Sequence, residues 1–219
     1  MITIKKLSPE SVYADLMEDL KVRLVFLREM LGAIALQVNE PRAYLKAESC
    51  FLQVRYICEL VALSSLCANE RFGLTSRLLK SWHAGEILAD LTRINPMCFP
   101  RAINVTRKNG ELLVEVQPEQ PLSQKALVSM YNSCGSVLHR GMLKHIIKGD
   151  DRLYDLKEVN RWAQKLIGLL ASHIALVPHG NRVLLINMNF GSSDPVMVAT
   201  ADGIHGEAFS VADPQASGA

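Results

Sequence analysis

The sequence predicts a mainly α (α+β) fold: a bundle of about five helices and two short β-hairpins that form a small antiparallel sheet. Three observations predict it. Residues 41–69 form one long helical stretch with apolar side chains on most sides, and such a helix is normally buried among others. Four further stretches repeat apolar residues at steps of three and four. Between them lie short β-type runs separated by turn residues.

The four other helices each begin at a residue that can cap a helix. Ser8, Thr75 and Ser123 precede three of them, and Asp155 with Glu158 resembles a capping box before the last. We expect helices over residues 9–36, 76–93, from 124 to Gly141 or to the charged stretch at 149–151, and 156–177.

The β-type runs form two pairs. Residues 102–107 and 111–117 flank Asn109-Gly110, a strong hairpin signal, and residues 183–190 and 196–200 flank a Gly- and Ser-rich turn. We therefore predict one domain over residues 1–207, with an inserted hairpin near 101–117, a C-terminal hairpin at 183–201 and a disordered tail at 208–219.

The composition excludes some classes of protein but indicates no particular function. The net charge is +2, although seven Lys or Arg residues lie between Arg71 and Lys108 against two acidic residues, which permits an anionic partner. The five cysteines contain no C-x-x-C pair and are typical of a reducing compartment. The first eleven residues contain no apolar stretch of the kind found in signal peptides, so we expect no signal peptide, and no charge-free apolar run is long enough to span a bilayer. We expect a cytoplasmic protein with no metal site, no cofactor and no membrane partner.

A polar stripe interrupts the central helix. Glu48, Arg55 and Glu59 stand at i, i+7 and i+11, within about 60° of one another around the helix. The stripe either faces water or forms a buried charge cluster. In the second case, Arg55 and Glu59 would be a structural ion pair, or they would also bind the stretch at His139 and Arg140 and orient a histidine there.

Two stretches place a guanidinium and an imidazole within one or two helical turns: Arg77 with His83, and Arg140 with His145. Such a pair suits RNA cleavage, because Arg neutralises the charge that develops on phosphorus while His moves the proton of a 2′-hydroxyl. The second stretch also contains His139 and Lys144 and could hold an anion; alternatively, its cations only favour a helix C-terminus.

Three segments carry a resemblance: FLQVRYICELVALSSLCAN, INPMCFPR and YNSCGSVLHRG. Together they resemble a family of uncharacterised, mostly helical bacterial proteins. More remotely, a helical bundle with an Arg-x4-His element is similar to the HEPN ribonucleases of toxin–antitoxin and phage-defence systems. That resemblance implies that Arg140 and His145 are a catalytic pair, although Gly141 stands where those enzymes usually have Asn, Asp or His.

Two functional hypotheses follow from the sequence. The first is a non-catalytic interaction or scaffold protein whose helices bind a protein partner. The alternative is an HEPN-like, metal-independent ribonuclease or RNA-binding protein, which would act as a homodimer with two Arg–His elements across one cleft. The sequence leaves it uncertain whether the protein is an enzyme.

Overall fold

The structure is a computed structural model. It describes the residues of seven segments, which are 8–36, 43–69, 75–108, 111–139, 154–177, 182–202 and 208–211.

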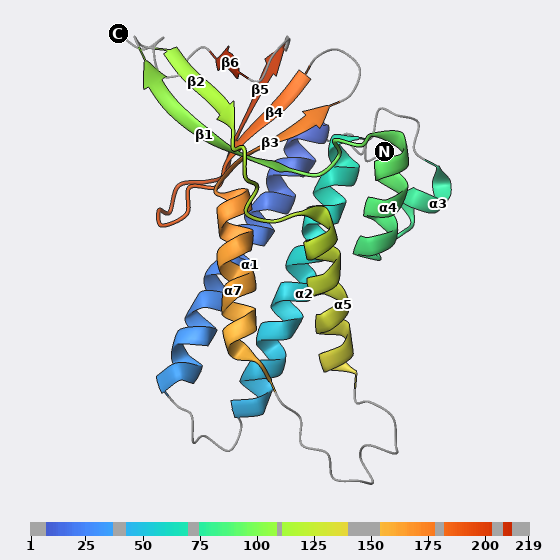
Figure 1. The fold of residues 1–219 in the computed structure, drawn as a ribbon, viewed down its shortest axis with the longest axis vertical. Helices are drawn as coiled ribbons and strands as arrows, with labels where there is room; N and C mark the ends of the chain where they lie inside the picture. The colour runs from blue at the N-terminus through green and yellow to red at the C-terminus, as the bar shows by residue number, and fades with distance from the viewer. Residues whose placement is uncertain are drawn as a thin grey trace, which may run out of the picture.

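Four long helices lie side by side and form the body of the molecule, and two shorter helices pack beside them near the end where the sheet lies (Figure 1). The long helices run alternately toward and away from the sheet. Their bounds are α1 (Pro9–Leu36), α2 (Ala43–Ala68), α5 (Gln124–Leu138) and α7 (Leu156–Leu170), and the short helices are α3 (Ser76–Leu79) and α4 (Ala84–Ile94).

Helix α2 is the core helix that the sequence predicts. Half of its residues are buried, including Val54, Ile57 and Val61, and it packs against α1, α4, α5 and α7. By length and composition alone this helix could also cross a membrane, but most of that stretch is buried inside the protein, as in the core helix of a bundle.

The predicted helix starts are confirmed. The side-chain oxygens of Ser8, Thr75, Ser123 and Asp155 each accept a hydrogen bond from the backbone N–H three residues later. Each of these bonds satisfies one of the N–H groups that have no partner within the helix. Helix α5 ends at Leu138, before both of the ends that we considered.

Two other predicted helices are also shorter than expected. The stretch 76–93 is not one helix, because residues 80–83 leave the helical path and α4 begins again after His83. The stretch 156–177 ends as a helix at Leu170, and residues 172–177 form a strand that pairs along its whole length with residues 182–187. Periodicity cannot separate a short buried strand from the end of a buried helix, and here the ladder of backbone hydrogen bonds favours the strand.

The sheet is larger than the two predicted hairpins. Six strands form one sheet in the order β5-β4-β3-β1-β2-β6, and all neighbours are antiparallel. Residues 208–211, which we predicted to lie in a disordered tail, pair with β2 and form the edge strand of the sheet. The bounds are β1 (Arg101–Lys108), β2 (Glu111–Val116), β3 (Ser172–Val177), β4 (Arg182–Asn187), β5 (Met197–Asp202) and β6 (Ala208–Val211).

Both faces of the sheet carry buried side chains. On one face Ala102, Ala175 and Leu184 join the core of the helices, which caps the bundle with the sheet (Figure 1). On the other face a second, smaller apolar cluster forms around Ile174 and Leu185. Successive side chains of a strand point to opposite faces of the sheet. Because both faces are apolar here, the sequences of β3 and β4 are continuous hydrophobic runs.

Candidate functional site

The predicted catalytic pair cannot be compared with the structure. Arg140, Lys144 and His145 lie outside the described residues. His139 is the last described residue of this stretch, where its exposed side chain follows the end of α5. The Arg140–His145 hypothesis therefore stays a prediction.

The polar stripe on α2 neither faces water as a whole nor forms one cluster. At one end the carboxylate of Glu48 accepts a hydrogen bond of 2.7 Å from the hydroxyl of Tyr154, just before α7. At the other end Arg55 and Glu59 pair with each other, with side chains that are 21% and 19% exposed. The two ends of the stripe therefore contact different side chains, and protein partly covers both ends.

Arg55 is held in place by α5. Its guanidinium donates a hydrogen bond of 2.6 Å to the Tyr131 hydroxyl, lies over the Tyr131 ring at 4.1 Å, and comes within 3.4 Å of Glu59. Gly135 makes this approach possible, because a Cβ there would stand only 2.8 Å from Nη1 of Arg55. Sequence reasoning missed Tyr131 and Gly135 as its partners; their i,i+4 spacing, on one side of a helix, is the signal that could have found them.

His83 also contacts Tyr131. Its ring meets the Tyr131 ring edge-on at 4.8 Å, and Nδ1 is buried without a hydrogen-bond partner among the described residues. The same histidine lines a hollow of about 280 Å³, together with Arg77, Lys80, the exposed Trp82 and two carboxylates. Although helix 76–93 is broken, the structure thus brings Arg77 and His83 to one hollow.

The described thiols and phenols near Arg55 are held in their neutral forms. Burial raises the pKa of Cys134 to about 12 and that of Cys58 well above its usual value. Burial also raises the pKa of Tyr131, and the Arg55 guanidinium only partly offsets this. A thiol or phenol that stays protonated at neutral pH is a poor nucleophile. Within the described segments, no three His, Cys, Asp or Glu side chains are placed to hold a metal ion.

His173 is fully buried and has partners on both ring nitrogens. Nδ1 lies 2.9 Å from the carbonyl oxygen of Leu170 and therefore donates to it, while Nε2 accepts from the Tyr13 hydroxyl at 3.0 Å. Burial lowers the pKa of His173 to about 4. This buried pair joins α1 to the start of β3 and is structural.

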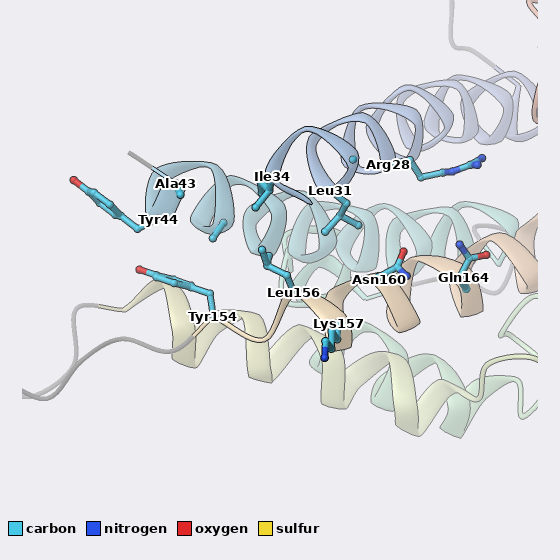
Figure 2. Close-up of a pocket in the computed structure, with 12 residues that line it drawn as sticks. Arg28, Leu31, Ile34, Ala43, Tyr44, Tyr154, Leu156, Lys157, Asn160 and Gln164 are labelled. Atoms are coloured by element: carbon cyan, nitrogen blue, oxygen red, sulfur yellow. The ribbon is translucent and has the colours of Figure 1, made fainter. Parts of the chain in front are cut away.

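A groove of about 790 Å³ lies at the end of the bundle away from the sheet and is a candidate binding surface (Figure 2). Leu31 and Ile34 reach from α1 toward α7, and Asn160 and Gln164 reach from α7 toward α1. Tyr44 and Tyr154 stand at one end of the groove. The complete lining is Arg28, Leu31, Gly32, Ile34, Ala43, Tyr44, Ala47, Tyr154, Leu156, Lys157, Asn160 and Gln164.

The sequence analysis did not identify this groove. Leu31 and Ile34 belong to the three- and four-residue apolar repeat of the helix predicted over residues 9–36, and nothing in their spacing shows that α7 diverges from them. The available signal was Gly32, because a glycine inside a helical pattern costs stability and calls for another reason.

No protein-family model matches the chain, and comparison with curated proteins and with solved structures gives no match either. No match therefore supports the resemblance to the uncharacterised bacterial family or the resemblance to the HEPN ribonucleases, and both stay expectations from the sequence.

Proposed function

We propose that this protein is a non-catalytic interaction protein, and that the groove between α1, α2 and α7 is the surface that binds its partner. The observation that supports the proposal is the groove itself, which exposes apolar side chains from three helices in one continuous surface (Figure 2). Ligand and partner sites are typically concave, mostly apolar surfaces with a few polar groups at defined places.

A second feature supports protein binding. The outer face of α1 exposes Val22, Val25 and Phe26, of which Val22 is 64% exposed. These residues border another hollow of about 550 Å³ beside residues 192–195. A monomer seldom exposes large apolar side chains at neighbouring positions without a partner to cover them.

A selection experiment tests the proposed function. A library of random peptides displayed on phage is enriched on the wild-type protein alone, and the enriched peptides are then measured against Gly32→Phe. Gly32 lines the groove and no atom lies within 4 Å of where its Cβ would be, so a side chain can start there without a clash, and we expect a phenylalanine ring to occupy the groove.

We expect peptides that bind the wild-type protein and bind Gly32→Phe at least about tenfold more weakly, a loss of ~1.4 kcal/mol. Gly32→Ala, which leaves the groove open, should bind them like the wild-type protein. Selected peptides that bind Gly32→Phe equally well would refute the groove as the partner site.

RNA binding is the second candidate function, and the exposure of Trp82 favours it. Trp82 is 65% exposed and shares its hollow with Arg77 and Lys80. An exposed aromatic ring beside cations can stack on a base of single-stranded RNA while the cations contact phosphates. The hollow also contains Glu86 and Asp90, which makes it less cationic than most RNA sites, and RNA binding is therefore ranked second.

Tryptophan fluorescence tests this candidate, because the chain has two tryptophans and the other, Trp162, is 9% exposed. Quenching by oligo(U) that disappears in Trp82→Phe would support RNA binding. Cleavage of oligo(U) that is lost in Arg140→Ala and in His145→Ala would support the HEPN-like ribonuclease, and size-exclusion chromatography would test its homodimer.

A further inference from the structure

We infer that the occupant of the groove is an acidic amphipathic helix of a protein partner. This inference rests on the proposed function, because it specifies which partner the groove between α1, α2 and α7 takes. Three properties of the groove carry it: the charge of its walls, the secondary structure of its walls, and the polar side chains within it.

The charged side chains that line the groove are all positive among the described residues. Arg28 comes from the α1 wall and Lys157 from the α7 wall, and both side chains are exposed, while no Asp or Glu is among the described residues that line the groove (Figure 2). A partner with carboxylates beside its apolar residues would place them near these two cations. A partner with basic flanks would be repelled, which is how charge sets specificity at an interface.

The walls favour a helix over an extended strand. A peptide strand gains affinity mainly from backbone hydrogen bonds to an open sheet edge. The described groove residues belong to α1, α2 and α7 or immediately precede α7, so they offer no such edge. A bound segment must then satisfy its own backbone, and a helix does so while presenting apolar side chains at i, i+3 or i+4, and i+7.

The dimensions of the groove agree with a short helix. Along α7 the lining runs from Leu156 to Gln164, and these nine residues of helix, which are eight steps apart from first to last, span about 12 Å. Two turns of a partner helix have a similar length. Such a segment would bring two or three apolar anchors over Leu31 and Ile34 of the α1 wall.

The polar side chains argue against a lipid chain as the occupant. Asn160 and Gln164 are exposed, stand one turn apart on α7 and face the groove (Figure 2). A hydrocarbon tail would remove water from these amides without returning a hydrogen bond, which is unfavourable. A peptide helix with polar flanking side chains can replace the lost water.

Designed peptides test the inference by fluorescence anisotropy. A labelled helix of about 16 residues carries leucines at i, i+3 and i+7 with glutamates on both flanks; a second peptide has lysines instead of the glutamates, and a third has a central proline in the glutamate version. Oleate serves as the lipid probe. Each probe is measured at low and at high salt against the wild-type protein, Gly32→Phe, and the double variant Arg28→Glu/Lys157→Glu.

We expect the glutamate peptide to bind at least about tenfold more tightly than the lysine or proline peptide, with a smaller preference over the lysine peptide at high salt. The double variant should prefer the lysine peptide, and Gly32→Phe should bind neither peptide. Equal or tighter binding of the lysine or proline peptide, no binding of the glutamate peptide, or binding of oleate alone would overturn the inference.

The two proposals can fail separately. If library peptides occupy the groove and are blocked by Gly32→Phe but prove to be basic or non-helical, the proposed function stands and the acidic-helix inference is wrong. If Gly32→Phe blocks no selected peptide, the proposed function itself is wrong.

Discussion

Two helical glycines show how differently the bundle is packed in two places. At Gly135 on α5, an added Cβ would stand 2.8 Å from Arg55 of α2. At Gly32 on α1, an added Cβ would meet no atom within 4 Å. The first glycine permits a close approach between two helices, whereas the second lines an open groove.

The two glycines mark two kinds of helix interface, one that is closed by contacts and one that opens into the groove. Between α2 and α5, Arg55 and Tyr131 are joined by a hydrogen bond and by a cation–π contact. Between α1 and α7, the end near the sheet is closed by the buried Tyr13–His173 pair, whereas the far end opens into the groove. Stability should therefore depend on the closed places and binding on the open one.

The largest predicted effect is the pH dependence from His173. Its pKa is about 4 in the folded protein, below the value of about 6.5 expected when unfolded. The unfolded state therefore binds the proton first as pH falls. The contribution of the neutral histidine is complete above about pH 6.5 and is lost as the pH falls to about 4, a change of ~3 kcal/mol.

Urea unfolding at a series of pH values measures this effect, with His173→Gln as the control that lacks the titrating ring. The wild-type protein should lose stability between pH 6.5 and pH 4 more steeply than the control. Parallel pH profiles would show that the closed end of the α1–α7 interface does not depend on a neutral His173.

Removal of the Arg55 guanidinium tests the closed α2–α5 interface. Arg55→Met should lower the free energy of unfolding by about 2–3 kcal/mol, because it leaves Glu59 and the Tyr131 hydroxyl partly covered without their partner. Arg93→Met is the matched control: Arg93 also pairs with a carboxylate on its own helix but is 77% exposed. Its loss should cost less than about 0.5 kcal/mol. Similar losses in both variants would mean that Arg55 does not join the helices.

Gly135→Ala should destabilise the protein by about 1 kcal/mol, since displacement of Arg55 outweighs the better helix propensity of alanine. The double-mutant cycle with Arg55→Met identifies the cause. In the Arg55→Met background the same change should be neutral or stabilising. A loss that persists there would show that the close approach to Arg55 is not what requires glycine.

Gly32→Ala should have the smallest effect, a gain of about 0.5–1 kcal/mol in the free energy of unfolding, because alanine restricts the unfolded chain and nothing obstructs its Cβ. Thermal unfolding of both alanine variants side by side measures the contrast. A loss of stability in Gly32→Ala would mean that this end of α1 is packed and the groove is not open.

The helices and their starts could be predicted because caps and apolar periodicity are local signals, as Ser123 and Asp155 show. The end of the last helix could not, because residues 172–177 become a strand only through pairing with β4. The Arg55 cluster was half predicted: the stripe on α2 was visible, but Tyr131 and Gly135 lie about 80 residues away. The groove depends on where two helices diverge, and no single stretch of sequence encodes that.

The most direct test of the central claim maps a selected peptide onto the protein by NMR of Ile, Leu and Val methyl groups. We predict shifts at Leu31, Ile34 and Leu156, which line the groove, and none at Val54 or Leu127 in the closed core. Shifts confined to Val22 and Val25 on the outer face of α1, or to Leu78 at the Trp82 hollow, would contradict the claim that the groove is the binding surface.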